Sequence, residues 1–559
     1  MVVSAMGRNT DTLVSLAREA SRKPPAREMD MLLSTGEQVS VALVAMAICD
    51  LGSRAVSMTG GQMGIRTDDS FSKARIREID TARINRLLDA GNIVVAAGFQ
   101  GIDDDMNITT LGRGGSDTTA VALAAVLGAD ACEIYTDVDG VYTTDPRKLP
   151  EARRVDVVSY DEMLELASLG AGVMHNRSIE FAKKFDVPIH VRSSFSDATG
   201  TMIVAENEAA DAPVSGAAMT ADEARVTVLG VPDRPGHSRQ IFDAIAREKI
   251  AVDMIVQNVG VDGSADLSFT VPSGELDATL SVLPSVIESV GAKGMTHDDH
   301  VAKVSVVGSG MATQPNVASR MFRALGDAGV NIQMITTSEI KISTLVSRDQ
   351  AAEALRAVHR EFELDRRPEG ARTWDQIRAD RAAGSADVKT LIERLRADAL
   401  EALTLTDISM STGQARVTLR GVPDRPGLAA ALFEAIGAAG IFVDMIVQGI
   451  DAHAESTSLS LTVGSGDLAK TLEVAKGVVA EHQLGGLSDD PSIAKITVSG
   501  IGLRSHTQVG RVLFEQLAAA GLNVEMISTS ELQVNAVVDP AKAAEATERL
   551  RGALAESMV

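Results

Sequence analysis

The chain has 559 residues, of which 45% are hydrophobic and 23% are charged, and its formal net charge is −23. This length exceeds a single hydrophobic core and predicts three or more domains, while the negative charge argues against nucleic acid and anionic membranes as partners. The two cysteines, Cys49 and Cys132, indicate buried thiols in a reducing cytoplasm, and we find no apolar run of about 18 residues that would predict a transmembrane helix.

The first residues, MVVSAMG, are typical of a buried strand that runs into a glycine-containing turn, and a helix is predicted over Asp11–Ala20. Proteins seldom begin in the middle of such an α/β unit. We therefore expect a further strand, loop and helix in front of Met1.

The N-terminal third alternates predicted strands with predicted helices. The strands are Ile93–Ala97, Ala131–Tyr135 and Pro188–Val191, and the helices are Asp80–Ala90, Thr118–Leu127 and Tyr160–Leu169. Such alternation predicts an α/β fold in which helices cover both faces of a mainly parallel sheet. Ligands of such sheets gather at the carboxyl ends of the strands, so the loops there are the candidate site.

One of these loops is rich in glycine and leads directly into a helix. It lies in TTLGRGGSDTTA, Thr109–Ala120. Gly112, Gly114 and Gly115 allow backbone N–H groups to approach an anion, the helix N-terminus adds positive potential, and Arg113 supplies a cation. The pattern alone is weak evidence for phosphate binding, and the chain has no P-loop motif.

Two further loops combine polar side chains. LLSTGEQVS places Ser34, Thr35 and Glu37 at a helix start, where a capping box between Ser34 and Glu37 is the alternative interpretation. YTDVDGVYTTDPR, Tyr135–Arg147, follows a predicted strand and mixes carboxylates, hydroxyls and an arginine.

The remainder of the chain is repetitive. RVTVLGVPDRPG from Arg225 returns as RVTLRGVPDRPG from Arg416, and VDMIVQ follows both copies. Each copy is succeeded by a second pair of similar segments, AKVSVVGSGM with NIQMITTSEI and AKITVSGIGL with NVEMISTSEL. The pattern within each unit predicts strand, helix, strand, strand, helix and strand, so we expect four ferredoxin-like βαββαβ units.

In the first unit, strands are predicted at Val226–Val231 and Val252–Val259, with a turn at Asp233–Gly236. The charged segment Asp365–Leu403 is predicted to be a linker that contains a helix. HDDH, His297–His300, is interpreted as a solvated turn, with a metal cluster as the alternative.

STGE, TTLGRGGSD and TDVDGVYTTDPR, in this order, resemble the amino-acid kinase family, and VPDRPG with TSEI resembles ACT domains, which bind amino acids between paired copies. The combination is similar to the aspartokinases. The resemblance implies ATP-dependent phosphorylation of the β-carboxylate of L-aspartate to 4-phospho-L-aspartate, with Mg²⁺ carried by ATP and no protein metal site. This reaction begins the route to lysine, threonine and methionine. The implied domains are a kinase domain (1–204), a linker (205–224), ACT units (225–296, 297–364, 415–487 and 488–559) and a helical linker (365–414).

The resemblance also implies roles for the loop residues. Thr35 and Glu37 would contact the substrate aspartate, and Asp117 and Arg113 would be the catalytic residues. The ATP site would contain Gly114, Gly115, Ser116, Thr136, Asp137, Tyr142 and Arg147. Members of the family usually start with a strand that ends in a K-F-G-G-T-S loop, which is the part expected in front of Met1.

Amino-acid effectors, lysine or threonine or both, would bind between ACT units. The first site would combine Asp253 and Gln257 with Asn331, Ile332, Ser338 and Glu339, and the duplicate would combine Asp444 and Gln448 with Asn523, Ser530 and Glu531. A cytoplasmic homodimer through the ACT units is expected. The alternative to an allosteric enzyme is an inactive, kinase-like amino-acid sensor without the K-F-G-G-T-S loop.

Overall fold

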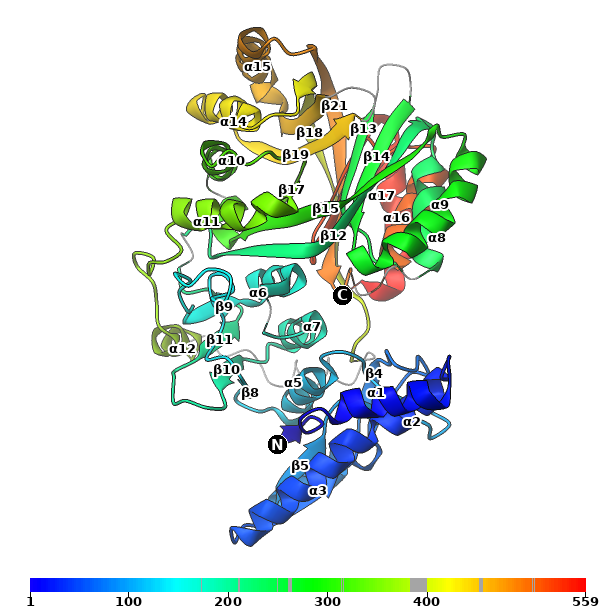
Figure 1. Cartoon of the computed structure of the whole chain (residues 1–559), viewed down its shortest axis with the longest axis vertical. Helices are drawn as coiled ribbons and strands as arrows, with labels where there is room; N and C mark the ends of the chain where they lie inside the picture. The colour runs from blue at the N-terminus through cyan, green and yellow to red at the C-terminus, as the bar shows by residue number, and fades with distance from the viewer. Residues whose placement is uncertain are drawn as a thin grey trace.

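The computed structural model describes residues 1–171, 173–209, 212–248, 250–259, 264–312, 314, 316–382, 400–451, 456–504, 506 and 508–558. Its elements form an N-terminal lobe, residues 1–204, and a repeat region above it in the view of Figure 1. The two regions correspond to the change of sequence pattern near residue 205.

The N-terminal lobe mixes short strands with helices. Its strands are β1 (Val2–Val3), β2 (Ala55–Met58), β3 (Ile65–Thr67), β4 (Ile76–Ile79), β5 (Ile93–Ala97), β6 (Gln100–Ile102), β7 (Ile108–Thr110), β8 (Cys132–Thr136), β9 (Val157–Ser159), β10 (Ile189–Ser193) and β11 (Thr201–Val204). Its helices are α1 (Asn9–Ala20), α2 (Ala26–Leu33), α3 (Thr35–Asp50), α4 (Ala82–Asp89), α5 (Gly115–Leu127), α6 (Tyr160–Leu166) and α7 (Asn176–Phe185). The strand predicted at Ile93–Ala97 and the helix predicted at Asp11–Ala20 are therefore confirmed.

The strands of the lobe form three sheets. β1 and β2 pair with β5 in parallel, and β8 pairs with β10 and β9 with β11 in parallel, whereas β10 and β11 are antiparallel. A third sheet, ordered β4-β3-β6-β7, has one parallel pair and two antiparallel pairs. The mainly parallel α/β class is confirmed, but the described strands are divided between separate sheets because no described strand bridges β1 and β8.

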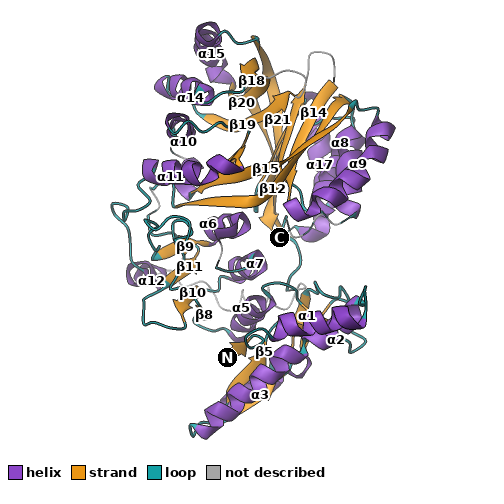
Figure 2. Ribbon diagram, in the orientation of Figure 1, coloured by secondary structure: helices purple, strands orange, loops and turns teal. Residues whose placement is uncertain are grey.

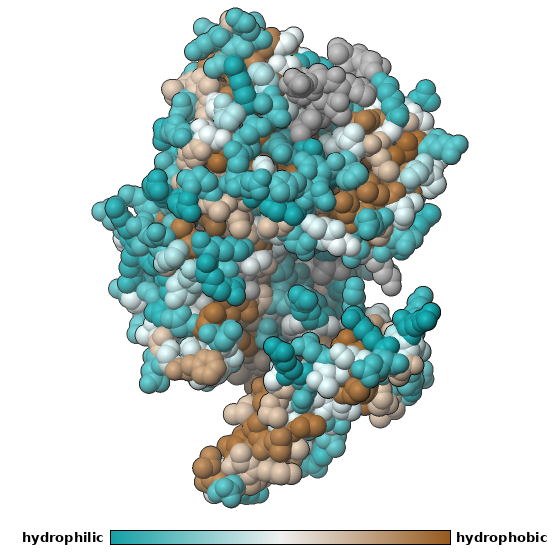
Figure 3. All heavy atoms as spheres, viewed as in Figure 1, coloured by the Kyte–Doolittle hydropathy of each residue, from teal (hydrophilic) through white to brown (hydrophobic). Residues whose placement is uncertain are grey.

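Helix α3 packs one side against β5 and exposes the other. Val41 and Ala45 contact Val95 and Ala97 in a small buried cluster. The outer side carries the exposed side chains Val39, Leu43, Met46 and Leu51, and hydrophobic surface covers the tip of α3 in Figure 3. The stretch Ala26–Asp50 is long and apolar enough to cross a membrane by length and composition alone. Two carboxylates in this stretch, Asp30 and Glu37, are buried and accept hydrogen bonds from Thr110 and Ala5 of the same lobe. The stretch is therefore packed into the lobe through polar contacts as well as apolar ones.

Among the described residues, the repeat region contains twelve strands. Helices flank these strands (Figure 2). The strands are β12 (Gly216–Pro232), β13 (Asp253–Val259), β14 (Ser264–Val271), β15 (Gly294–Val307), β16 (Met334–Ser338), β17 (Lys341–Ser347), β18 (Thr404–Pro423), β19 (Val443–Asp451), β20 (Ser456–Gly464), β21 (Gly486–Ile501), β22 (Met526–Thr529) and β23 (Gln533–Val538). The helices are α8 (His237–Arg247), α9 (Leu276–Val290), α10 (Val317–Asp327), α11 (Ala351–Glu361), α14 (Leu428–Ala438), α15 (Leu468–His482), α16 (Gln508–Ala519) and α17 (Ala543–Ala553).

Four long strands each serve two units. The C-terminal half of β12 begins unit 1, which continues through α8, β13, β14 and α9 to the first residues of β15. The rest of β15 begins unit 2, with α10, β16, β17 and α11, and residues 216–220 of β12 supply its last strand. β18 and β21 repeat this arrangement in units 3 and 4.

The four βαββαβ units are therefore present, but they are not the consecutive segments that the sequence predicted. Residues 216–220 and 404–411, assigned to linkers, are strand residues paired with β15 and β21. These segments become strands because each completes a unit: without them, units 2 and 4 would each lack a fourth strand and leave an edge of the sheet unpaired.

The described strands of the four units join into one sheet, ordered β13-β14-β12-β15-β17-β16-β19-β20-β18-β21-β23-β22, and helices lie outside it. One core joins units 2 and 3 and another joins units 1 and 4. A third cluster joins buried strand residues from all four units: Met254, Val256, Val301, Met334, Leu345, Met445, Val447, Ile493, Met526 and Val537. Unit 2 pairs with unit 3 through β16 and β19, and β13 of unit 1 lies against β22 of unit 4. The described units thus pair with one another within one chain.

Three smaller predictions are refined. HDDH lies in strand β15 and not in a turn. The linker contains helix α12 (Trp374–Ala382), whose Trp374 and Ile377 pack on β9 and β11 of the lobe. Cys132 is buried as predicted, but Cys49 is exposed.

Candidate active site

The start of α3 carries a buried carboxylate. Glu37 is 4% exposed, and its Oε1 accepts a hydrogen bond from the backbone N–H of Ala5, 3.0 Å away. Its Oε2 is buried without a hydrogen-bond partner among the described residues. Burial raises the pKa of this carboxyl group. A cationic or hydrogen-bonding ligand group would satisfy this oxygen.

Close packing sets the position of this carboxylate. A Cβ on Gly36 would lie 2.9 Å from the Cβ of Ala5, so only glycine lets α3 start this close to the end of β1. The alternative capping box is not formed, because the hydroxyl of Ser34 donates to the carbonyl of Met31. The hydroxyl of Thr35 likewise donates to the carbonyl of Leu32, 2.7 Å away, and the residue is exposed beside the site.

The glycine loop, Leu111–Ser116, lies next to this helix start. The backbone at Gly112 and Gly114 has φ of 79° and 70°, in the left-handed region, and Gly114 is the N-cap of α5. A Cβ on Gly114 would lie 2.2 Å from the Cβ of His175, so the loop is in close contact with the N-terminus of α7. Left-handed glycines followed by a helix N-terminus form an anion-binding concavity.

Residues that follow β5 connect the two loops. A Cβ on Gly98 would lie 2.8 Å from the Oγ of Ser116, and the side-chain amide of Gln100 donates to the carbonyl of Ser34, 3.0 Å away. The carboxyl ends of β1 and β5 thus bring Glu37 and the glycine loop to the same edge of the lobe, as the rule for such sheets predicts.

The first turn of α5 adds a second perturbed carboxylate. Burial raises the pKa of Asp117 to about 6. Arg113 is exposed in the glycine loop. Burial, then Arg177 and Arg113, lowers the pKa of His175. A half-buried carboxylate in the first turn of a helix that follows a glycine loop can orient donors around a phosphate group.

Of the remaining predicted nucleotide residues, Thr136 ends β8, which packs against α5, and the others follow this strand. The hydroxyl of Thr136 lies 3.2 Å from Oδ1 of Asp137, and the hydroxyl of Tyr142 donates to Oδ1 of Asp139, 2.8 Å away. Burial and Asp139 raise the pKa of Tyr142. Arg147 is exposed and forms a bidentate pair with Asp145. Thr136 and Tyr142 are half-buried, whereas Asp137 and Arg147 are exposed.

The loops suit the phosphates of a nucleoside triphosphate. The cradle at Gly114, where no Cβ fits, and the α5 N-terminus offer amides and not metal ligands. No cluster of three or more His, Cys, Asp or Glu side chains that could hold a metal ion is present in the described part of the chain.

Two structural residues of the site escaped the sequence analysis. Asp30 is completely buried and accepts hydrogen bonds from the amide and hydroxyl of Thr110, both 2.8 Å away, just before the glycine loop. Arg177 contacts the other side of that loop and pairs with Glu401. No short motif marks either residue, because each acts across a long sequence separation.

The predicted effector residues are regrouped by the structure. Gln257 donates to the carbonyl of Val524, 2.8 Å away, and Gln448 donates to the carbonyl of Ile332, 3.3 Å away. Asn331 donates to Asp424, and Asn523 donates to Asp233. Unit 1 residues thus face unit 4, and unit 3 residues face unit 2. The predicted first site grouped Gln257 with Asn331 and Ile332, whereas within this chain Ile332 contacts Gln448 and Gln257 contacts Val524.

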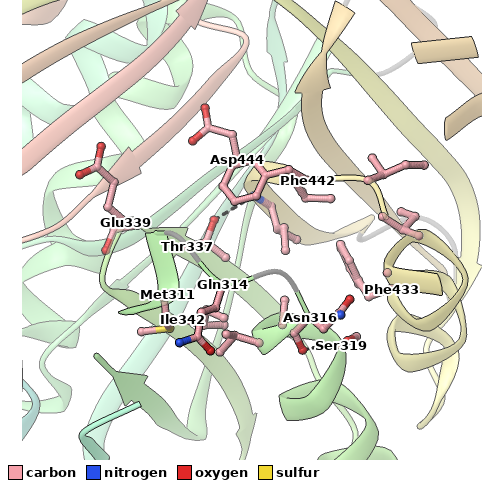
Figure 4. Close-up of a pocket in the computed structure, with 18 residues that line it drawn as sticks. Met311, Gln314, Asn316, Ser319, Thr337, Glu339, Ile342, Phe433, Phe442 and Asp444 are labelled. Carbon is pink, nitrogen blue, oxygen red and sulfur yellow. Dashed lines mark hydrogen bonds between the residues drawn. The ribbon is translucent and has the colours of Figure 1, made fainter. Parts of the chain in front are cut away.

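Each pair of units also encloses a cavity at its other end. The cavity between units 2 and 3 measures about 250 Å³ and contains Ser338, Glu339 and Asp444 (Figure 4). The cavity between units 1 and 4 measures about 170 Å³ and contains Asp253 and Ser530. Glu531, in contrast, is 2% exposed and accepts from Asn176 of the N-terminal lobe, so it lies at the junction with that lobe.

Comparison with known proteins agrees with this architecture. The family model for the amino acid kinase family matches residues 1–193, and the model for ACT domains matches residues 304–362, 417–477 and 496–554. An aspartate kinase from Stutzerimonas stutzeri is 51% identical over 367 residues, which cover 65% of this chain and 89% of the relative. An aspartokinase from Thermus thermophilus is 48% identical and covers 66% and 91%.

Solved structures give the same result. The aspartate kinase from Synechocystis aligns with 100% of this chain and 92% of its own, with 37% identity and a TM-score of 0.55. E. coli aspartokinase III, solved with aspartate and ADP, aligns with 63% of this chain and 80% of its own, with 27% identity and a TM-score of 0.53.

The lobe brings the buried Glu37 carboxylate and the glycine loop to the same edge, and paired βαββαβ units follow it. Together with the family matches, these features define an amino-acid kinase with a C-terminal array of ACT domains. Relatives near 50% identity and the aligned structures narrow that class. The chain belongs to the aspartokinase family of transferases.

Proposed function

We propose that this chain phosphorylates the β-carboxylate of L-aspartate with MgATP and so forms 4-phospho-L-aspartate, the first step toward lysine, threonine and methionine in the cytoplasm. The observation that carries the proposal is the buried Glu37 carboxylate, whose Oε2 has no partner among the described residues, at the same edge as the glycine loop. E. coli aspartokinase III, a structural relative, was solved with aspartate and ADP.

The residues would divide the work between two substrates. Glu37 would pair with the ammonium group of aspartate, and Thr35 would contact the same substrate from the exposed rim. Backbone amides at Gly114 and Gly115, with Ser116, would hold the phosphates, while Arg113 and Asp117 would arrange charge around the transferring group. Bound ATP supplies Mg²⁺, which neutralises phosphate charge.

The experiment traps the acyl phosphate with hydroxylamine. Aspartate, MgATP and the protein should give a hydroxamate, and glutamate in place of aspartate should give none. The assay is run on the 559-residue chain and on a form extended by any in-frame upstream codons. If neither form yields hydroxamate, the proposal fails and the sensor alternative replaces it.

We further propose that lysine binds the cavity between units 2 and 3. Glu339 and Asp444 contribute carboxylates there, and the described residues that line the cavity include no Lys, Arg or His. Oδ2 of Asp444 pairs with Lys495, which lies outside that lining, so lysine would compete with this partner or use the other carboxylate oxygen. Such a lining favours a ligand with two ammonium groups over threonine. E. coli aspartokinase III was also solved with lysine and aspartate.

Calorimetry distinguishes the two effector cavities. Asp444→Asn should weaken lysine binding about tenfold, whereas Asp253→Asn, at the matching position between units 1 and 4, should leave it unchanged. If lysine does not bind the wild-type chain at millimolar concentration, or if Asp444→Asn has no effect, the assignment is wrong. A homodimer remains part of the proposal, and sedimentation measures it.

A further inference from the structure

Arg177 joins three parts of the molecule at the entrance to the glycine loop. It lies in the first turn of α7, and its side chain is 13% exposed. One guanidinium nitrogen donates to the carbonyl of Leu111, and another donates to the carbonyl of Ala74, 2.9 Å away. The same side chain forms a bidentate pair with Glu401, at distances of 2.8–3.0 Å.

The carbonyl of Leu111 is a sensitive position in the loop. Its amide already donates to the carbonyl of Phe99, 2.9 Å away, so Arg177 fixes the second polar group of the same residue. Gly112 follows directly with a left-handed backbone, and a Cβ on Gly115 would lie 2.9 Å from the Cβ of Leu111. The orientation of Leu111 therefore sets the direction in which the loop amides point.

Glu401 in turn holds Arg177. It comes from the segment that leads into β18, far from the N-terminal lobe in sequence, and is 7% exposed. Its backbone N–H donates to the carbonyl of Ile76, 3.1 Å away, and its Oε2 accepts from the N–H of Ile76, 2.5 Å away. The backbone N–H of Leu400 donates to the carbonyl of Arg77, 3.1 Å away. These hydrogen bonds attach the segment to the edge of β4.

We propose that Arg177 is a positioning residue for the glycine loop and that Glu401, from the segment leading into units 3 and 4, sets its orientation. Arg177 touches loop backbone and no reacting group, so it acts through the loop amides. A buried guanidinium that loses its carboxylate partner reorients toward water or other acceptors, and the Leu111 carbonyl then loses its donor. The inference rests on the proposed function, because it assumes that the loop holds nucleotide phosphates.

The test is Glu401→Gln, with the dissociation constants of MgADP and aspartate measured separately by calorimetry. Affinity for MgADP should fall about tenfold, whereas affinity for aspartate should change less than about twofold. Glu401→Asp, which keeps the charge, should give an intermediate loss. Glu361→Gln breaks a more exposed ion pair with Arg320 inside unit 2 and should change neither constant.

The separate constants distinguish positioning from general destabilisation, which would affect both ligands. If Glu401→Gln fails to fold, Glu401→Asp and Arg177→Lys provide the same comparison. Wild-type affinity for MgADP in these variants overturns the inference while leaving the proposed function intact. If the wild-type chain binds neither ligand, the proposed function fails and this inference with it.

Discussion

The two ends of α5 offer a matched test of the glycine loop. Gly114 caps its N-terminus and Gly128 its C-terminus, both with left-handed backbone, at φ of 70° and 61°. A Cβ on Gly128 meets no atom within 4 Å, whereas a Cβ on Gly114 would lie 2.2 Å from the Cβ of His175. Alanine at either position therefore carries the same backbone strain, but only Gly114→Ala forces a displacement.

The magnitudes follow from this geometry. Left-handed strain lowers the free energy of unfolding by roughly 1–2 kcal/mol for each variant. Ordinary contact begins at 3.4 Å, so Gly114→Ala must move the loop or His175 by about 1 Å, and a displacement of that size costs about 100-fold in turnover. Gly128→Ala should keep wild-type turnover.

Urea denaturation gives the stability of both variants, and hydroxamate trapping gives their turnover. Gly114→Ala should also weaken MgADP binding in calorimetry, while Gly128→Ala should not. Equal turnover of the two variants, after both are shown to be folded, would refute the claim that this loop holds the phosphates.

Three further predictions concern single ionisable groups. Glu37→Gln should raise the KM for aspartate roughly 10–100-fold, because it removes a charge-assisted bond to the ammonium group, with the KM for ATP unchanged in steady-state kinetics. Since burial raises the pKa of Asp117 to about 6, kcat/KM for ATP should fall about tenfold per pH unit below that value, and a flat profile would contradict this role. Burial and Arg75 lower the pKa of His506 to about 4, so the unfolded chain binds more protons between about pH 4 and 6.5. Stability should therefore drop by about 2 kcal/mol from pH 7 to pH 5, and His506→Gln should remove that part of the drop in urea denaturation.

Local patterns allowed part of the fold to be predicted. Strand β5 was found from its continuous apolar run, and the glycine loop was recognised because glycines stand directly before a helical pattern. Glu37 was found through the STGE motif, although the local pattern fitted a capping box equally well. The structure decides against the box, because Ser34 and Glu37 bond to different partners.

Long-range features could not be predicted. The segment Gly216–Thr220 is rich in alanine and has little intrinsic strand preference, so its role as the last strand of unit 2 depends on pairing with β15. The duplicated units have similar patterns, and nothing local specifies that unit 1 faces unit 4. The pair of Arg177 and Glu401 spans 224 residues and carries no motif.

The most direct test of the account is whether the protein makes an acyl phosphate on aspartate and loses that activity when Glu37 is neutralised. Hydroxamate trapping with MgATP, on the 559-residue chain and on a form extended by in-frame upstream codons, measures it. The account predicts aspartyl hydroxamate from at least one form, and with Glu37→Gln a large loss at low aspartate that saturating aspartate restores. Absence of hydroxamate from both forms, or undiminished activity of Glu37→Gln at low aspartate, would contradict it.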